Sequence, residues 1–217
     1  SQFIEMFGDP VTNPMGWSAK TLGVLGELKN GMNFSSRDKG YELHCLGVGD
    51  FSDYETMENT ENLSVISLNE MPSADYMLRN EDIVFVRSNG NKALVGRSII
   101  VYPNKTPTTF SGFCIRYRLH EEKVNLKYLI GLLHSFSIRE RLLSNGRGAN
   151  ITNLNQQMLS MLPVPLPPLE LQNRFAAFVE STDKSKFATE CGVKTAHFAI
   201  HLKDFHDIMI SRRCENV

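Results

Sequence analysis

Residues 153–172 have the sequence NLNQQMLSMLPVPLPPLELQ, which contains the sharpest change of pattern in the chain. A short helix is predicted over 155–161, begun by the capping-type residues Thr152 and Asn153. The alternating prolines that follow exclude a helix and favour an extended strap ending at Pro168. We therefore place a domain boundary at the end of this strap.

The sequence from Leu22 to about Leu119 is typical of short strands separated by turn residues. Asn89, Gly90 and Asn91 lie between the apolar runs IVFV and ALVG, and they predict a hairpin that presents polar and basic groups at a loop tip. This part of the chain is expected to form a mainly β domain.

One strand of that domain shows a clear alternation of apolar and polar residues. Its inward positions are predicted to be Phe113, Ile115, Tyr117 and Leu119. Arg116 and Arg118 fall on the opposite face, so we expect that face to be a basic outer side.

Helical spacing of apolar residues occurs in two later regions. A single helix of about 15 residues is predicted between Leu126 and Leu143, packed on the sheet. After the proline strap, a second set predicts a helix that pairs with another helix, although a polar stretch over 182–194 interrupts it. The members of this set are Leu171, Phe175, Phe178, Phe198, Leu202, Phe205 and Met209.

The formal net charge of -1 conceals an uneven distribution of charge along the chain. Residues 1–82 hold 5 basic against 14 acidic side chains, residues 83–169 hold 11 against 3, and residues 170–217 hold 7 against 7. No acidic residue occurs between Ile83 and His120, as a surface that faces phosphates requires. The alternative is that the acidic first part of the chain folds back and pairs with these basic residues.

Length and composition bound the class of protein. With 217 residues, of which 41% are apolar, the chain can bury one core and carry an extension. No apolar run approaches the roughly 18 residues that cross a bilayer, and the chain does not begin with a basic region followed by an apolar stretch. The 4 cysteines are widely spaced without a C-x-x-C pair, which favours reduced thiols. These features predict a cytoplasmic protein that does not bind a membrane.

The sequence lacks the motifs of a self-sufficient DNA enzyme. Residues 47–50, Gly-Val-Gly-Asp, come nearest to a glycine turn for a nucleotide-type cofactor, but an acidic stretch follows them instead of an apolar helix face. The polar-Pro-Pro-aromatic tetrad of a methyltransferase does not occur, and the acids of 50–61 are scattered rather than clustered for magnesium. His197 and His201 are four residues apart, but we interpret them as packing or surface residues and not as zinc ligands. No catalytic residue, metal or cofactor is expected.

Loop residues with the chemistry of DNA recognition occur in and beside the basic segment. Arginine can bind guanine and asparagine can bind adenine in the major groove, while lysine neutralises phosphate. Turn formation is the alternative role for asparagine and serine in loops. The candidates are Arg37, Lys39, Arg87, Ser88, Asn89, Asn91, Lys92, Arg97, Arg147, Asn150 and Asn153.

Three stretches resemble the DNA specificity subunits of type I restriction-modification enzymes. They are GWSAKTLGVLGELKNG at 16–31, NEDIVFVRSNG with VGRSIIV within 80–101, and above all GRGANITNLNQQMLSMLPVPLPPLELQ at 146–172. The resemblance covers about residues 7–187. It implies a target-recognition domain that reads one half of a split DNA sequence. It also implies a long helix that spaces this domain from a second one and docks methyltransferase subunits.

The expected fold is α+β, in three parts. Residues 1–14, whose SQFIEMFGDP resembles the end of a spacer helix, form a helix remnant and linker. Residues 15–168 form the mainly β target-recognition domain with packed helices, and residues 169–217 form a long, coiled-coil-like spacer or dimerisation helix. Residues 188–217 depart from the charged, leucine-rich helix of the family.

The resemblance further implies a subunit without catalysis of its own. The expected partners are double-stranded DNA, methyltransferase (modification) subunits, the restriction/translocase subunit through the complex, and a second copy of the chain in a homodimer. Methyl transfer from S-adenosylmethionine and DNA cleavage would belong to those partners. The alternative is a regulatory or decoy fragment that dimerises or binds methyltransferase subunits without reading DNA.

Overall fold

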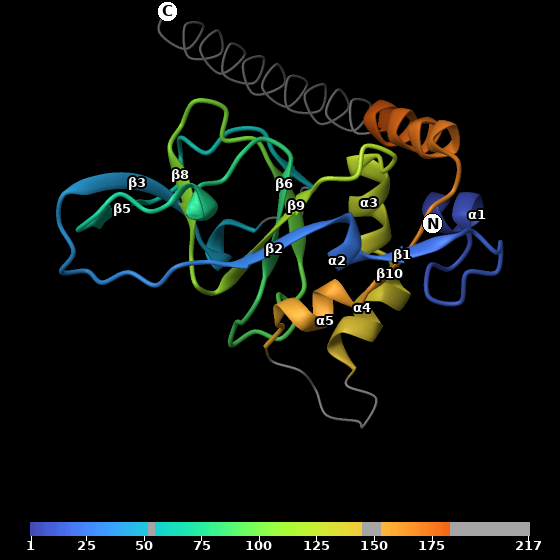
Figure 1. Ribbon diagram of the computed structural model, residues 1–217, viewed down its shortest axis with the longest axis horizontal. Helices are drawn as coiled ribbons and strands as arrows, with labels where there is room; N and C mark the ends of the chain where they lie inside the picture. Colours follow the sequence, from blue (N-terminus) through green and yellow to red (C-terminus); the bar gives the residue numbers. More distant parts are fainter. Residues whose placement is uncertain (52–54, 145–152, 183–217) are drawn as a thin grey trace, which may run out of the picture. The chain divides into compact units, whose positions relative to one another are not determined.

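The computed structural model of the protein describes residues 1–51, 55–144 and 153–182, and the chain divides into two units, 1–175 and 176–217. The first unit holds the strands and helices labelled in Figure 1. This division does not test the predicted boundaries at 14 and 168, which stay predictions.

The strands of the first unit form three small sheets, with the orders β1-β10, β2-β9-β6-β7-β4 and β5-β3-β8. The strands are β1 (Ala19–Thr21), β2 (Gly26–Asn30), β3 (Tyr41–Leu46), β4 (Thr56–Met57), β5 (Val65–Leu68), β6 (Asp82–Val86), β7 (Ser98–Val101), β8 (Thr108–Phe110), β9 (Cys114–Leu119) and β10 (Pro163–Pro165). The helices are α1 (Gln2–Phe7), α2 (Leu22–Leu25), α3 (Leu126–Leu133), α4 (Phe136–Leu143) and α5 (Gln156–Ser160), with 3-10 turns η1 (Val48–Asp50) and η2 (Ala74–Tyr76). The expected α+β class is confirmed.

The five-stranded sheet is covered on both faces. On one face, Val84 and Cys114 belong to a core cluster with Leu46 and Phe110 of the three-stranded sheet. On the other face lie α2 and α3 (Figure 1), where the Tyr117 hydroxyl donates to the α2 carbonyl of Leu22 at 3.1 Å. The central strands β6 and β9 are therefore buried from both sides, as strands in a covered sheet must be.

The predicted basic outer side of β9 was wrong. β9 pairs with β2 on one side and β6 on the other, and Arg116 is only 1% exposed. Its Nη2 lies 2.8 Å from Glu27 Oε1, and Arg118 pairs with the buried carboxylate of Asp82. The alternative interpretation of the charge pattern, in which the acidic first part of the chain pairs with the basic residues, is thus correct for these two arginines. Glu27 and Asp82, both among the first 82 residues, neutralise them in the sheet.

The Glu27–Arg116 pair gives the fold a defined response to acid. The Arg116 guanidinium donates to the Glu27 carboxylate and lowers the pKa of Glu27, with the charges of Arg116, His120 and Arg118 adding to the effect. The ionised carboxylate therefore stabilises the fold fully above the ordinary glutamate pKa of about 4.3, and this stabilisation is lost as the pH falls through the lower pKa of the folded state.

We expect Glu27→Gln to lower stability at neutral pH and to weaken the further loss of stability on acidification below about pH 4.3. Urea unfolding of both proteins at a series of pH values measures this. Parallel stability curves for the variant and the wild type would contradict the role given to Glu27.

The helix predicted between Leu126 and Leu143 is two helices, α3 and α4, so that prediction was wrong in its continuity. Ser135 separates them in an extended conformation, and its hydroxyl donates to the Leu132 carbonyl at 2.7 Å. A serine that bonds to the preceding turn competes with helix continuation. The predicted packing on the sheet is confirmed for α3.

The opening stretch 153–172 forms α5 and β10. The predicted helix is present, but its cap is Asn155, whose Oδ1 accepts from Met158 N at 2.9 Å, instead of Thr152 or Asn153. The prolines are extended, as predicted, and β10 pairs antiparallel with β1, with Lys20 opposite Val164. The strap is therefore part of the fold and not a free connector.

An aromatic cluster joins α1 to the residues after the strap. The rings of Phe3, Phe7, Tyr128 and Phe175 pack together, with Phe3 and Phe175 centroids 5.5 Å apart in an edge contact. Residues 169–182 are helical, Leu171 is half-buried and Phe178 is 45% exposed. Phe175 of the predicted stripe thus packs within the first unit. The other members Phe198, Leu202, Phe205 and Met209 lie outside the described residues.

A buried glutamine fixes the start of that helix. Gln172 Oε1 accepts from Asn125 N at 2.9 Å, and its Nε2 donates to the carbonyls of Pro167 at 2.8 Å and Lys123 at 3.2 Å. We expect Gln172→Ala to lower the free energy of unfolding by about 1–2 kcal/mol, because buried backbone groups lose their partners. Denaturant unfolding measures this. Arg174→Ala, at an exposed position of the same helix, is the control, and an equal effect of the two would contradict the role of Gln172.

Two further features are the state of the buried cysteines and the character of the helices. Cys45 and Cys114 are free and buried, and burial raises the pKa of each thiol to about 12. A thiol with such a pKa stays protonated and unreactive at neutral pH. Within the ranges that the structure describes, no helix has the length and apolar character needed to span a bilayer.

Candidate nucleic-acid interface

Three segments that are distant in sequence meet where β6 ends. The backbone N–H groups of Arg87 and Ser88 donate to the Phe113 carbonyl at 2.8 and 3.3 Å. Leu154 N donates to the Arg87 carbonyl at 2.8 Å, and Ser88 and Asn153 form an isolated antiparallel bridge. The structure therefore brings together three of the predicted readers, Arg87, Ser88 and Asn153. We call them, with Phe113, the β6-end cluster.

Two glycines allow a fourth segment to support this cluster. A Cβ on Gly31 would clash with the backbone of Ser111, and a Cβ on Gly112 would clash with the side chain of Asn33. The turn between β8 and β9 is consequently held against the residues after β2, with Gly112 N donating to the Met32 carbonyl at 2.8 Å. The cluster is thus built on a rigid backbone, which favours precise recognition.

Arg87 is the central cation of the β6-end cluster. Its side chain is half-buried, and its Nη1 lies 3.4 Å from the Gly112 carbonyl. That distance is long for a hydrogen bond, and a guanidinium has five N–H donors in a planar fork. The arrangement orients the guanidinium with a weak internal contact, which a stronger acceptor can replace.

The chain reverses between β6 and β7 as predicted, but the predicted second run was wrong, because ALVG lies in the connection and β7 begins at Ser98. Asn89 Oδ1 accepts from Asn91 N at 2.7 Å, and Asn91 Oδ1 accepts from Ala93 N at 3.0 Å. Both amides thus stabilise the turn, which is the role considered above as the alternative to binding bases. Bidentate binding of adenine uses both ends of an amide, so it would require these bonds to break.

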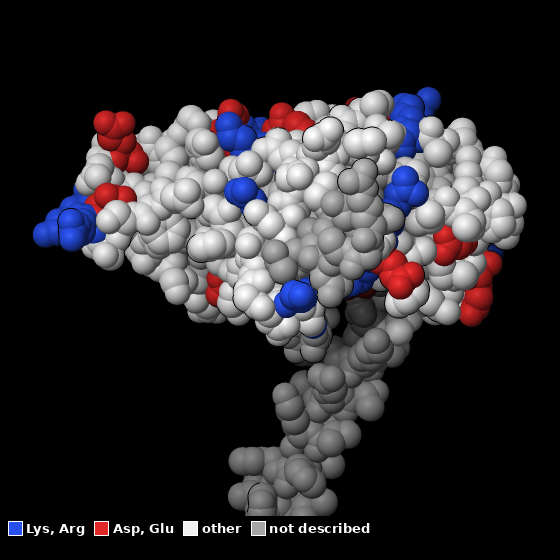
Figure 2. Space-filling model, turned by 90° about the horizontal axis from the view of Figure 1, so that it is seen from below, with Lys and Arg blue, Asp and Glu red and all other residues white. Residues whose placement is uncertain are grey.

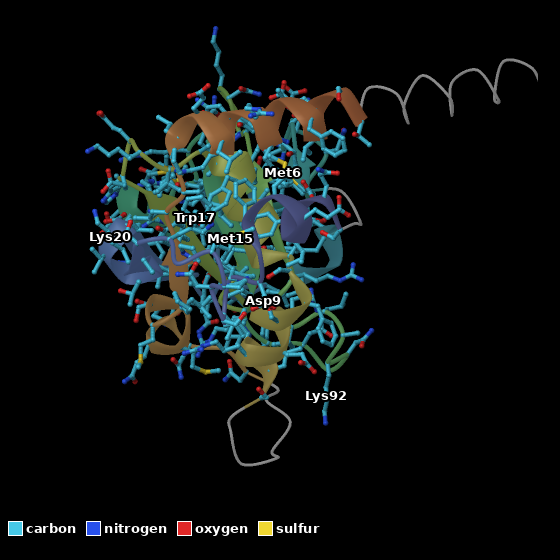
Figure 3. The ribbon with its side chains drawn as sticks, turned by 90° about the vertical axis from the view of Figure 1, so that its right-hand side faces the viewer. Met6, Asp9, Met15, Trp17, Lys20 and Lys92 are labelled. Atoms are coloured by element: carbon cyan, nitrogen blue, oxygen red, sulfur yellow. The ribbon has the colours of Figure 1, made fainter. Side chains whose placement is uncertain are left out.

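Basic side chains surround this hairpin. Lys92 is exposed and projects from the body of the molecule in Figure 3. Burial lowers the pKa of Arg139 on α4, and the nearby charge of Arg97 lowers it further. Arg139 Nη2 also donates to the Ala93 carbonyl at 3.3 Å, so α4 supplies a cation beside the hairpin. An approaching phosphate would relieve the repulsion between the two arginines.

The other predicted readers are not part of this group. Arg37 and Lys39 are exposed in the β2–β3 connection, at the left end of Figure 1 and apart from the β6–β7 connection at its lower centre. Lys39 N bonds to Asn69 Oδ1 at 3.1 Å, which ties that connection to the end of β5. Arg147 and Asn150 lie outside the described residues.

Figure 2 shows the face that includes α5 and the β6–β7 connection. Basic side chains are spread over this face, including its left end, while acidic side chains lie mainly toward its edges. Such a face suits a polyanion better than the net charge of -1 suggests.

Sequence reasoning missed two residues here. Phe113 was predicted to point inward but is 60% exposed, because it precedes β9 and belongs to the turn. The Ser111-Gly112 pair before it was the available signal for a turn. Arg139 was missed because nothing local to α4 indicates that it lies beside the hairpin. In the described part of the chain, no group of three or more His, Cys, Asp or Glu could hold a metal ion.

Comparison with known proteins identifies the family of this chain. A family model described as the type I restriction modification DNA specificity domain matches residues 14–195. The chain belongs to this family. Among curated specificity subunits, that of StySPI from Salmonella potsdam is 31% identical over 174 residues, or 76% of this chain and 36% of the relative. That of EcoEI from Escherichia coli is 25% identical over 184 residues, covering 79% and 30%.

The chain thus spans about a third of the length of these two specificity subunits. Solved structures share its fold. The HsdS subunit from Thermoanaerobacter tengcongensis aligns with a TM-score of 0.60 at 19% identity, over 86% of this chain and 42% of that one. A chain of a type I R-M system, solved to describe complex assembly and conformational transition, aligns with a TM-score of 0.57 at 19% identity, covering 81% and 40%.

Proposed function

We propose that this member of the specificity family reads one half of a split DNA target and directs the partner subunits of a type I restriction-modification complex to it. The observation that carries the proposal is the β6-end cluster, which gathers Arg87, Ser88 and Asn153 from separate segments on a rigid support. Family membership supplies the class of ligand.

The proposed mechanism divides the contacts by chemistry. Arg87 binds a base edge, since a planar guanidinium fits the two acceptors of guanine in the major groove. Lys92, Arg97 and Arg139 neutralise phosphates beside it and so position the domain on the duplex. Ser88 and Asn153 supply further polar contacts to bases, while Arg37 and Lys39 contact the backbone at a separate point.

Catalysis in this proposal belongs to other subunits. Methyl transfer from S-adenosylmethionine to adenine would be performed by methyltransferase subunits, and cleavage by a restriction/translocase subunit that joins the same complex. The chain itself would act in the cytoplasm as a non-catalytic subunit, with residues 15–168 as its target-recognition domain.

The helix beyond residue 168 is proposed to bind partners. The exposed ring of Phe178 and the half-buried Leu171 begin the apolar stripe predicted to pair with a second copy or with methyltransferase subunits. Two-fold pairing would present two copies of the β6-end cluster to a palindromic split target. The mass of the purified chain in solution, alone and with a methyltransferase subunit, tests this part.

The test of the proposal is selection from a pool of random DNA duplexes, by the full chain alone and assembled with methyltransferase subunits. Enrichment of one sequence in either condition is the expected result, and retention should fall steeply with salt because phosphates are neutralised. Recovery of an unselected pool in both conditions would overturn DNA reading. Methyltransferase binding without any sequence preference would favour the regulatory or decoy role instead.

A further inference from the structure

Phe113 is a large apolar side chain exposed inside a polar cluster. It is 60% exposed, and its own carbonyl accepts the N–H groups of Arg87 and Ser88. Single exposed apolar residues are ordinary on protein surfaces. This one differs because its carbonyl is bonded to the backbone of Arg87 and Ser88, the two residues proposed to contact bases, which makes Phe113 part of the β6-end cluster.

The backbone that carries Phe113 is held from both sides. Phe113 N lies 3.3 Å from Ser111 Oγ, and the preceding Gly112 is fixed to Met32 by its N–H and to the Arg87 guanidinium by its carbonyl. Since Gly31 and Gly112 leave no room for a Cβ, this turn cannot move away from the support without losing these bonds. The backbone that carries the ring is therefore held in place.

We propose that Phe113 is a specificity-determining residue that contacts the 5-methyl group of a thymine in the major groove. The inference rests on the proposed function and names one chemical feature of the target. In the major groove, thymine differs from every other base by this methyl group, and an apolar side chain is what reads it. Charge favours DNA as the occupant, since the exposed Lys92 and the guanidinium of Arg139 lie at the hairpin that follows Arg87.

The experiment uses the sequence selected by the full chain in the presence of methyltransferase subunits. Each thymine of that sequence is replaced in turn by deoxyuridine, which removes only the methyl group. At one position the replacement should lower the affinity of the wild type by about fourfold, which corresponds to the free energy of burying one methyl group. Phe113→Ala should bind the unmodified sequence about tenfold more weakly and show no further loss at that position.

Phe136→Ala is the matched control. Phe136 is 75% exposed at the start of α4, and it belongs neither to the β6-end cluster nor to the residues proposed to contact phosphates. This variant should bind the selected sequence as the wild type does and should keep the deoxyuridine effect. The unfolding midpoint of each variant, measured in urea, shows that the protein assayed is folded.

The outcomes separate this inference from the function on which it rests. A selected sequence that tolerates every deoxyuridine replacement in the wild type overturns the inference alone, whatever the variant does. So does an equal deoxyuridine effect in Phe113→Ala and the wild type. Failure to select any sequence overturns the proposed function, and this inference with it.

Discussion

Replacing Asp82 with alanine is expected to lower the free energy of unfolding by about 3–5 kcal/mol. Asp82 is buried at the start of β6, and its two carboxylate oxygens accept from Arg118 Nε and Nη2 at 2.8 Å each. It also accepts from Arg79 N at 2.7 Å. In the variant the largely buried guanidinium of Arg118 loses its main partner of opposite charge. Removing one partner of a buried ion pair lowers stability by more than the intact pair adds to it. Urea unfolding followed by circular dichroism measures the change.

Glu121→Ala is the control for Asp82→Ala. Glu121 forms an ion pair with Lys20 at 2.8 Å, but both side chains are accessible to solvent. Water replaces such a partner readily, so the unfolding midpoint should move little. If both variants lose the same stability, burial is not what makes the Asp82 pair important.

The second large effect concerns binding. Arg87→Ala should weaken binding to the selected DNA sequence by about 1–3 kcal/mol and relax the preference at one base pair. The fold should persist, because the Arg87 N–H and carbonyl bond to Phe113 and Leu154 through the backbone, which alanine retains. Titration of labelled duplexes gives the affinity, and repeated selection with the variant gives the altered preference.

Lys105→Ala removes the same charge from the same basic segment and serves as the control. Lys105 is exposed and follows β7, so the antiparallel pairing of β6 with β7 puts it at the opposite end of the sheet from Arg87. Its loss should leave base preference unchanged. Equal weakening by both variants, without a change in selected sequence, would mean that Arg87 contributes only charge.

The sequence predicted elements well where local pattern and tertiary context agree. The extended prolines and the short helix before them were found where composition placed them, and the predicted reversal after β6 is present although its second strand begins at Ser98 and not at Ala93. Errors arose where partners distant in sequence decide the outcome. Alternation in β9 suggested an outer face, but Glu27 and Asp82, far earlier in the chain, cover Arg116 and Arg118 within a sheet.

The candidate site could be predicted only in part for the same reason. A count of charges grouped Arg87, Lys105, Arg116 and Arg118 into one basic segment. The chain reverses direction between paired strands, however, so residues close in sequence can lie at opposite ends of the sheet. Two of these arginines are therefore neutralised in the sheet, and Lys105 lies at its other end. The bond between Arg87 and Leu154 joins residues that no local pattern connects.

The pairing of β1 with β10 also has a consequence for how the protein is made. Lys20 lies opposite Val164, so β1 leaves the ribosome long before its partner strand β10. At usual rates of about 5–20 residues per second, β1 waits on the order of 10–30 s for its partner. A closing pair of such long range is also slow to form. We expect the rest of the domain to assemble first on the nascent chain, with β1 unprotected from proteases until synthesis has passed the prolines.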